Sequence, residues 1–435
     1  MAAMGCQFGA LSQPPRPPLF PACGPSPERS PDWQFFRDHC ILYIQNQDHT
    51  KKTRVMPMKF SVLQEELAHG LSIVSRAVSP RSTLPVLSNI LVATDEGRLR
   101  LSATNLELGI TSWINAKIEE EGSTTVPSRT FSDLVSTLPP DKTNITLNAN
   151  TQTLNVQSGS LNTDIKCIDA QEFPPMPTPD QEPGVEINVK DLKEMIRQVV
   201  FAASRDEARP ILTGVLVTAK EDELTLAAAD GFRLSVRTAN LSSPVEKPFK
   251  VVIPGRALSE LARISEDGSE VVTMSLPPGR GQVIFRTKNS ELISQLIEGT
   301  FPDYQQIIPK NYQTRTLISS SAFLKACKQA EIFAREGSLI AQINISPGNE
   351  DMEPGEVEIS GQSEETGSSQ SVLDATIEGP DLIIAFNVRY LREVLDVIDT
   401  PNVVLETTKP TSPGVIRPVG EENFLHVIMP MHLGN

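Results

Sequence analysis

An apolar segment that follows a turn occurs early in this chain and returns twice. It reads Thr83-Leu84-Pro85-Val86-Leu87-Ser88-Asn89-Ile90-Leu91-Val92 at first, and later Arg209-Pro210-Ile211-Leu212-Thr213-Gly214-Val215-Leu216-Val217. A weaker version is Leu339-Ile340-Ala341-Gln342-Ile343-Asn344-Ile345. The copies are roughly 125–130 residues apart, which is far longer than the period of a solenoid repeat. The segment therefore predicts three tandem domains of one fold.

Two further patterns accompany each copy. One is a pair of alternating strands, predicted at 99–104 with 106–112, at 224–229 with 233–238, and at 356–361 with 369–376, where the connection is longer and acidic. The other is a strand that runs into an amphipathic helix, as in Thr125-Val126-Pro127-Ser128-Arg129 before Phe131 and Leu134. Earlier helices are predicted at about 62–78, 189–203 and 322–333. Short strands with turn signals between them favour antiparallel sheets, so the predicted fold class is α+β.

The domain boundaries follow from these copies and from Pro-rich connections between them. We predict domains at 58–180, 181–309 and 310–435, with Met58-Lys59-Phe60 opening the first strand. Residues 1–57 are Pro-rich and lack periodicity, which is typical of a disordered extension. Its short basic run, Lys51-Lys52-Thr53-Arg54, is more typical of a solvated linker than of a targeting signal or a DNA-binding tail.

Composition narrows the class of protein. No apolar run approaches the roughly 18 residues that a membrane helix needs. The N-terminus has no basic region ahead of an apolar stretch, so it does not resemble a signal peptide. The 5 cysteines are scattered without a close C-x-x-C pair, which predicts neither a zinc site nor a disulfide framework and suits a reducing cytoplasm.

The net charge of −15 argues against nucleic-acid binding unless the basic residues gather locally. Many of them lie on the predicted helices, and Lys193 and Arg197 share one helical face. Acidic residues concentrate in turns such as Glu119-Glu120-Glu121. Solvated helix faces would explain any single helix, but recurrence in all the predicted helices favours a positive surface on an acidic protein.

Several short motifs occur in a fixed order along the three domains. They are Met58-Lys59-Phe60, Arg81-Ser82-Thr83-Leu84-Pro85, Ala229-Asp230-Gly231-Phe232-Arg233-Leu234, Phe301-Pro302-Asp303-Tyr304, Phe386-Asn387-Val388 and Val427-Ile428-Met429-Pro430-Met431. With them, the chain from Met58 to Leu433 resembles the beta subunit of bacterial DNA polymerase III, the sliding-clamp family. The resemblance implies three clamp domains per chain and a ring made by two chains joined head to tail. It implies a non-catalytic processivity factor without a cofactor, which slides on double-stranded DNA in the cytoplasm and associates with the nucleoid during replication.

A geometric estimate favours a dimer over a closed monomer. Helices pack about 10 Å apart, so the helices of one chain would enclose a hole of only about 9 Å. Twice as many helices would leave about 28 Å, which exceeds the roughly 20 Å width of B-DNA. One chain is therefore too small to encircle a duplex, and two chains are large enough.

The resemblance also implies two sets of site residues. Positions that face DNA in the family correspond to Arg81, Arg129, Lys193, Arg197 and Arg256. A pocket between the second and third domains, which takes a short peptide of polymerases, of other repair and replication proteins and of the clamp loader, corresponds to Leu212, Gly231, Arg233, Leu234, Pro302, Ile307, Asn387, Tyr390, Val427, Met429, Pro430 and Met431. Its Leu, Ile, Pro and Met residues would form an apolar slot, in which Met adapts to different partners.

Some residues of these sets have other interpretations or depart from the family. Without the resemblance, Met429-Pro430-Met431 would be predicted to be a frayed chain end. Phe232 and His432 stand where many relatives have His and Arg, and Gln305-Gln306 replaces a basic pair. These changes would shift the preferred peptide motif.

Two other functions remain open at the level of sequence. An enzyme is one, but the chain has no Gly-rich phosphate loop, H-E-x-x-H or G-x-S-x-G motif and no metal-ligand cluster. Asp230-Gly231 is more typical of a turn than of a catalytic carboxylate. The other is a β-rich repeat scaffold that binds proteins but not DNA, in which the helix cations would not converge on one surface.

Overall fold

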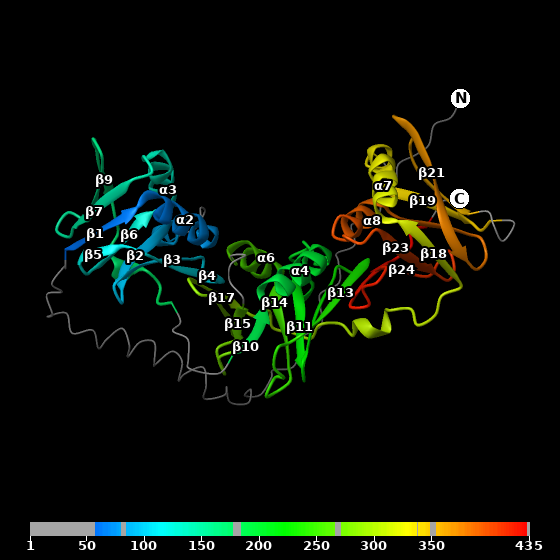
Figure 1. The fold of residues 1–435 in the computed structure, drawn as a ribbon, viewed down its shortest axis with the longest axis horizontal. Coiled ribbons are helices and arrows are strands. Elements are labelled where there is room, and N and C mark those ends of the chain that lie inside the picture. The colour runs from blue at the N-terminus through cyan, green and yellow to red at the C-terminus, as the bar shows by residue number, and fades with distance from the viewer. Residues whose placement is uncertain are drawn as a thin grey trace, which may run out of the picture. The chain divides into compact units, whose positions relative to one another are not determined.

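A computed structural model describes residues 57–79, 84–176, 184–265, 271–336, 338–348 and 354–432. The predicted extension lies outside these residues except for Pro57, and Arg81 lies outside them as well. The described chain repeats one plan of paired helices and antiparallel strands along three domains (Figure 1). The predicted α+β class and the three tandem domains are confirmed.

The first domain contains two helices among nine strands. Its elements are β1 (Met58–Leu63), α2 (Gln64–Val74), β2 (Asn89–Asp95), β3 (Arg98–Thr104), β4 (Leu108–Ile114), β5 (Lys117–Glu120), β6 (Ser123–Pro127), α3 (Ser128–Thr137), β7 (Lys142–Asn148), β8 (Thr153–Ser158) and β9 (Leu161–Lys166). Strands β1, β5, β7, β8 and β9 form a sheet of their own.

The second and third domains follow the same order. The second consists of β10 (Val185–Asn188), α4 (Val189–Val199), α5 (Pro210–Thr213), β11 (Gly214–Lys220), β12 (Glu223–Ala229), β13 (Arg233–Asn240), β14 (Phe249–Pro254), α6 (Gly255–Ile264), β15 (Val271–Ser275), β16 (Gln282–Arg286) and β17 (Ser290–Gln295). The third consists of β18 (Thr314–Ser319), α7 (Ser320–Ala334), β19 (Ile340–Ser346), β20 (Gly355–Ser363), β21 (Gly367–Glu378), β22 (Leu382–Asn387), α8 (Val388–Leu395), β23 (Asn402–Thr407), β24 (Gly414–Pro418) and β25 (Phe424–Ile428).

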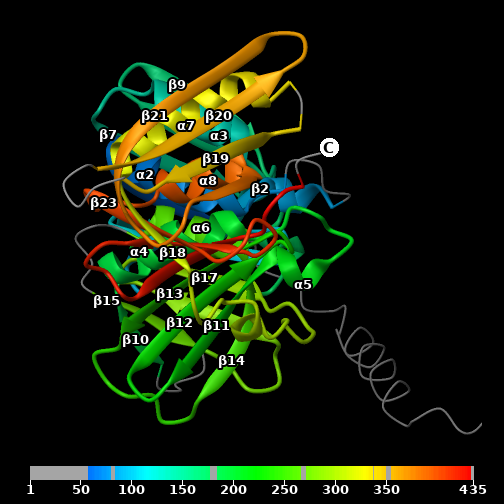
Figure 2. The same cartoon turned by 90° about the vertical axis from the view of Figure 1, so that its right-hand side faces the viewer.

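The first helix of each domain packs on two strands of a sheet. In α4, the buried residues Leu192, Met195 and Val199 recur with helical spacing and face β12 and β13. The Asn188 side chain accepts hydrogen bonds from the backbone N–H groups of Lys190 and Asp191, which would otherwise lack partners at the helix start. Likewise α2 packs on β3 and β4, and α7 packs on β20 and β21 (Figure 2).

Two strand pairings cross the domain boundaries. β17 of the second domain pairs with β4 of the first, from Ser290 opposite Ser112 to Ser294 opposite Leu108. β25 of the third domain pairs with β13 of the second, from Phe424 opposite Arg237 to Ile428 opposite Arg233. An 8-stranded sheet therefore spans the first two domains, and a 12-stranded sheet spans the last two. In both joints the last strand of one domain pairs with the fourth strand of the domain before it.

The structure corrects the sequence predictions at three places. Leu106, predicted to begin a strand, lies in a turn with φ of 79°, and β4 begins at Leu108. The segment from Pro210 to Thr213 forms the short helix α5 before β11 begins, so its apolar residues are not all strand. The acidic connection in the third domain is short, because β20 and β21 extend until Ser363 opposes Gly367.

A glycine on β20 allows the close approach of α7. A Cβ atom added at Gly361 would lie 2.5 Å from the carbonyl oxygen of Ala330, in the backbone of α7. That distance is too short for any side chain, and a helix backbone moves less readily than a flexible side chain.

We expect the substitution Gly361→Ala to lower the free energy of unfolding by about 1–3 kcal/mol, because α7 must move off the sheet. Urea titration at fixed protein concentration measures this change. Ser360→Ala, on the same strand, serves as the control and should leave stability within about 0.5 kcal/mol of the parent. Equal stability of the Gly361 variant and the parent would show that the helix does not depend on this contact.

Candidate functional site

The joint between the second and third domains contains a buried arginine. The Arg233 side chain is only 8% exposed. Its Nε donates to Oδ2 of Asp230 at 3.0 Å, and its Nη2 donates to the carbonyl oxygen of Phe201 at 2.7 Å. Its Nη1 donates to a carboxylate oxygen of Glu393 in the third domain. Each of the three guanidinium nitrogens therefore has a hydrogen-bond partner, as burial of a charge requires.

Two aromatic rings flank the same guanidinium. The Cζ atom of Arg233 lies 4.3 Å from the ring centroid of Tyr390 and 5.3 Å from that of Phe201. Both distances are within the range of a cation–π contact. Burial, followed by the charge of Asp230, raises the pKa of the Tyr390 hydroxyl, so this tyrosine stays protonated and can donate a hydrogen bond.

The turn before β13 shapes this joint. Gly231 has φ of +96°, a conformation that suits glycine. Oδ1 of Asp230 accepts hydrogen bonds from the backbone N–H groups of Phe232 at 2.8 Å and Arg233 at 3.0 Å. Both oxygens of Asp230 are therefore used by the turn and by Arg233, which confirms the turn interpretation over a catalytic carboxylate.

The C-terminal segment is fixed across this joint. The backbone N–H of Met429 donates to the carbonyl of Phe232 at 2.8 Å, and that of Met431 donates to the carbonyl of Ala385 at 2.8 Å. Met429 remains 38% exposed, so its side chain is available on the surface. The interpretation as a frayed end is wrong, because the turn before β13 and the strand β22 supply acceptors for this backbone.

The other predicted pocket residues lie around the same place. Leu212, Leu234 and Val427 belong to one buried apolar cluster, against which Tyr304 packs. Pro302 and Ile307 flank Tyr304 and are exposed, Ile307 by 41%. Asn387 accepts a hydrogen bond from the backbone N–H of Arg389 and so caps α8, which carries Tyr390. The structure thus brings both sides of the predicted pocket to the joint.

Sequence reasoning missed three residues of this joint: Phe201, Glu393 and His426. His426 is fully buried on β25; its Nδ1 forms a hydrogen bond with the Ser235 hydroxyl, and its ring stacks on Phe201 at 5.4 Å. Burial, and then the charge of Arg233, lower the pKa of His426 well below its usual range. The alternation of β25 could have marked His426 as inward-facing, but its partners are distant in sequence.

The predicted DNA-facing residues have different surroundings. Arg129 on α3 is 95% exposed and lies 3.8 Å from Asp133. Arg256 on α6 is exposed and has no ion pair with a residue that the structure describes. Arg197 on α4 binds Asp399 of the third domain, and Lys193 is half-buried on the same helix. Arg81 lies outside the described residues.

The predicted separation of helix cations from loop anions is wrong in part. Carboxylates on the helices themselves pair with several of the arginines and lysines. The pairs are Arg197 with Glu194, Arg76 and Arg263 with Glu260, Arg389 and Arg392 with Glu331, and Lys328 with Asp396. Residues three or four apart on a helix, or on adjacent helices, approach closely enough to pair, and a count of charges along the chain does not show this.

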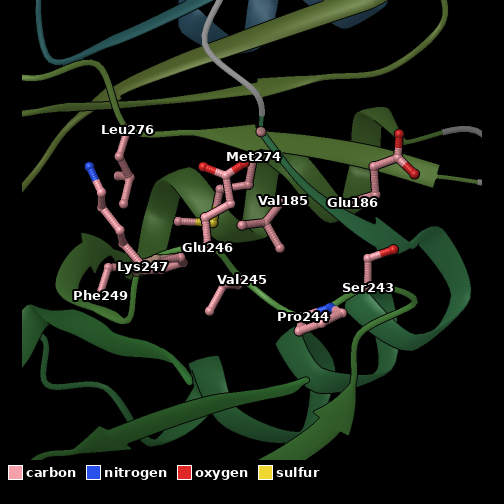
Figure 3. Close-up of a pocket in the computed structure, with 11 residues that line it drawn as sticks. Val185, Glu186, Ser243, Pro244, Val245, Glu246, Lys247, Phe249, Met274 and Leu276 are labelled. Atoms are coloured by element: carbon pink, nitrogen blue, oxygen red, sulfur yellow. The ribbon is translucent and has the colours of Figure 1, made fainter. Parts of the chain in front are cut away.

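A separate hollow of about 630 Å³ lies at the β10 end of the 8-stranded sheet. Figure 3 shows Val185 and Met274 close together, as expected for residues paired across β10 and β15. Its lining includes the carboxylates Glu186 and Glu246 but neither histidine nor cysteine, and none of the predicted site residues.

Two features of the described residues bear on the class of protein. They contain no group of three or more His, Cys, Asp or Glu side chains placed to hold a metal ion. None of their helices is long and apolar enough to cross a membrane.

Comparisons with known proteins match the whole described chain. Family models for the N-terminal, central and C-terminal domains of the DNA polymerase III beta subunit match residues 58–177, 186–303 and 305–432. The chain belongs to the DNA polymerase III beta-subunit family. A relative from Synechococcus elongatus, named Beta sliding clamp, is 34% identical over 379 residues, which cover 86% of this chain and 100% of the relative. A Bacillus subtilis protein of the same name is 32% identical over 385 residues, covering 86% and 99%.

Solved structures of beta subunits have the same fold. The DNA polymerase sliding clamp from Bacillus subtilis superposes with a TM-score of 0.81 at 31% identity, covering 87% of this chain and 100% of that one. The DNA polymerase III beta subunit from Thermotoga maritima superposes with a TM-score of 0.79 at 27% identity, with coverage of 87% and 100%. The first family match begins at Met58, so residues 1–57 lie outside it.

The buried histidine predicts a pH dependence of stability. The folded state keeps His426 neutral, whereas the unfolded chain takes up a proton below about pH 6.5. This contribution to stability is present above that pH and is lost as the pH falls, by up to about 1.4 kcal/mol per pH unit. Urea titrations between pH 7.5 and 5.5 should show this slope in the parent, and His426→Gln should flatten it. His69→Gln, at an exposed position, is the control and should keep it; an unchanged slope in the His426 variant would contradict the assignment.

Proposed function

We propose that this protein is a ring-forming processivity clamp that encircles double-stranded DNA as a head-to-tail homodimer. It tethers replicative polymerase and other replication and repair proteins to the duplex, slides without sequence specificity and has no catalytic activity of its own. Family membership supports the clamp function, and the free strand edges of the chain support its closure by a second copy.

The two joints inside the chain follow one rule. In each, the last strand of a domain pairs with the fourth strand of the preceding domain, as β17 does with β4 and β25 with β13. In each joint, the first helix of the preceding domain, or the turn after it, also contacts the second helix of the following domain, or the turn after that helix. Arg76, which follows α2, binds Glu260 of α6 at 3.3 Å, and Arg197 of α4 binds Asp399, which follows α8.

The same rule leaves two complementary edges without a partner among the described residues. β9, the last strand of the first domain, pairs only with β8. β21, the fourth strand of the third domain, pairs with β18 only from Ala375 to Glu378, so its edge from Gly367 to Asp374 is unpaired on that side. β9 of one copy therefore fits β21 of another, with α7 facing α3. Two such joints close a ring of two chains.

Contacts with DNA in such a ring would come from cations on the helices. We assign this role to Arg81, Arg129, Lys193, Arg197 and Arg256. Exposed and weakly paired residues such as Arg129 and Arg256 suit it best, because a clamp that slides needs long-range contacts with phosphates and no contacts with bases. The ion pair of Arg197 with Asp399 reduces its share of the positive potential.

Partners would bind at the joint between the second and third domains. Exposed Met429 and Ile307 next to the buried cluster of Leu212, Leu234 and Val427 offer an apolar slot for a short peptide. Arg233, Gly231, Pro302, Asn387, Tyr390, Pro430 and Met431 complete the assigned pocket. Polymerases and a clamp loader would compete for this one site in each chain.

We further propose the domain limits 58–180, 181–309 and 310–435, which are supported by family matches that end close to them. A cytoplasmic location, at the nucleoid during replication, follows from the proposed role on DNA.

Ring closure predicts an effect of Ile332, which is 53% exposed on α7, the helix that packs on β20 and β21. We expect Ile332→Arg to raise the dimer dissociation constant by roughly tenfold or more, because it places a charge in a buried interface. Sedimentation velocity over a concentration series measures this constant. Ile383→Arg, at a residue 48% exposed on β22 away from the proposed joint, is the matched control and should leave the dimer intact. Equal effects of both variants would argue against closure through α7 and β21.

Topological linkage to DNA is the direct test of the function. The protein is loaded onto a nicked circular duplex with a clamp loader and ATP, and its retention is followed by gel filtration before and after linearisation. A clamp is retained on the circle and lost from the linear form, because it slides off the ends. Equal retention on both forms would indicate ordinary contact binding, and no retention with an active loader would favour the protein scaffold.

A further inference from the structure

The joint between the first and second domains has the same turn geometry as the joint between the second and third domains, where we place the peptide pocket. In the turn before β4, Oδ1 of Asn105 accepts from the backbone N–H groups of Glu107 at 3.1 Å and Leu108 at 2.7 Å. Asp230 makes the same two contacts before β13. Leu106 has φ of 79° at the position of Gly231, which has φ of 96°. A non-glycine residue in this conformation is strained, and strain of this kind clusters at functional sites.

The strained leucine lies beside a small hollow whose lining is partly apolar and partly polar, the polar residues being Thr104, Glu107, Gln282 and Gln295. Leu106 is 53% exposed and lines, with Pro174, Met176 and Ile293, a hollow of about 160 Å³. Met176 lies close above Gly109, where an added Cβ atom would be 2.5 Å from its Cε atom. Methionine is flexible enough to adjust to an inserted side chain. We call this hollow the Leu106 slot.

A larger groove adjoins the slot and shares Pro174, Pro175 and Met176 with it. This outer groove has a volume of about 830 Å³, and its charged lining consists of Arg98, Arg100, Arg286 and Lys288 against Glu96 and Glu291. The cations therefore exceed the carboxylates on the surface of a chain whose net charge is −15. Such a local excess attracts acidic ligands.

Two of these cations have unused binding capacity. The Nε of Arg100 is buried and has no hydrogen-bond partner, and its nearest carboxylate, Asp95, is 3.8 Å from Nη1. Lys288 is exposed and has no ion pair with any residue in the described part of the chain. Arg286, by contrast, is held at 3.0 Å by Glu291. The Nε is out of a ligand's reach, but the Arg100 side chain is 39% exposed, so its outer N–H groups can donate to a ligand in the groove.

The outer groove lies on the face of the sheet away from the helices. Leu99 and Leu101 of β3 are fully buried in the core under α2, and residues alternate between faces along a strand. Arg98 and Arg100 therefore point to the opposite face, where Arg100 stands opposite Trp113 of β4. This surface is separate from the helices proposed to face DNA and from the peptide pocket at the other joint.

We propose that the outer groove and the Leu106 slot together bind an extended acidic peptide of a partner protein, in which an apolar residue lies next to carboxylates. The apolar side chain enters the slot, and the neighbouring carboxylates reach Arg100 and Lys288. Adjacent side chains of one extended peptide can reach both, because the two hollows share the same wall. The proposal does not depend on ring closure or on the peptide pocket assigned above.

A nucleic acid fits this surface less well. The ring of Trp113, which lines the outer groove, is not free to stack on a base. Its Nε1 donates to Asp95 at 2.8 Å, and Arg98 lies over its face at 5.9 Å. Single-stranded binding depends on such stacking.

Trp113 supplies a local signal for the test. The chain has 2 tryptophans, and the other, Trp33, lies outside the described residues. In the full-length Trp33→Phe variant, fluorescence reports on the outer groove alone. We would titrate it with the capped hexapeptide GDDLDG, with its amide analogue GNNLNG, and with a short oligothymidylate. The acidic peptide should change the emission saturably, with an affinity that falls as the salt concentration rises. The amide analogue should not change the emission.

Two substitutions and two matched controls locate the binding. In the Trp33→Phe background, Lys288→Glu and Leu106→Asn should each weaken the acidic peptide about three- to tenfold, since asparagine keeps the turn conformation but removes the apolar side chain. Lys220→Glu, 72% exposed on another hairpin, and Val419→Asn, 42% exposed near β24, should have no effect. No saturable change with the acidic peptide, equal weakening by the controls, or a response to the oligothymidylate alone would overturn the proposal.

Discussion

Backbone hydrogen bonds between strands of different domains are the interaction on which the rest of this structure depends. β4 with β17 and β13 with β25 form ladders that fix neighbouring strands about 4.8 Å apart and in one register. The domains at each joint therefore cannot slide past one another without breaking several bonds together. Side chains from both domains meet in a fixed geometry there, and both surfaces proposed to bind peptides lie at or beside such a ladder.

The two ladders share a backbone but differ in the chemistry that they hold. At the second joint, Arg233 brings a charge into the interior, where Asp230, Glu393 and the carbonyl of Phe201 satisfy it. At the first joint, Leu108 occupies the matching turn position, and the charged residues lie instead on the outer face of the sheet. One repeated backbone thus presents two unlike surfaces, and a clamp can use both at once if they bind different partners.

The buried charge also links the pocket to the integrity of the joint. Removing one partner from a buried, hydrogen-bonded charge leaves the others unpaired, which costs more than the pair contributes by its presence. Tyr390 lies over this guanidinium and Asn387 caps the helix that carries it. The residues to which we assign peptide binding are therefore held by the same contacts that hold the domains together.

Local patterns predicted much of the fold. The helical spacing of Leu192, Met195 and Val199 placed α4 correctly, because a helix buries one face whatever covers it. Leu106 was predicted to be strand, since alternation of side chains does not reveal a positive φ. The separation of charges failed at Glu331, which pairs with Arg389 and Arg392 on a helix more than fifty residues further along the chain.

The sequence by itself determined the three repeats, the α+β class, the family and most of the residues around the peptide joint. These properties follow from periodicity and from short motifs, which show how each segment buries its own apolar side chains. Only the tertiary structure decided which strand edges pair across domains, that Phe201, Glu393 and His426 meet Arg233, and that Arg100 and Lys288 share a groove with Leu106. The physical reason is that an alternating strand specifies which face is buried but not which distant segment lies against its edge or its outer face.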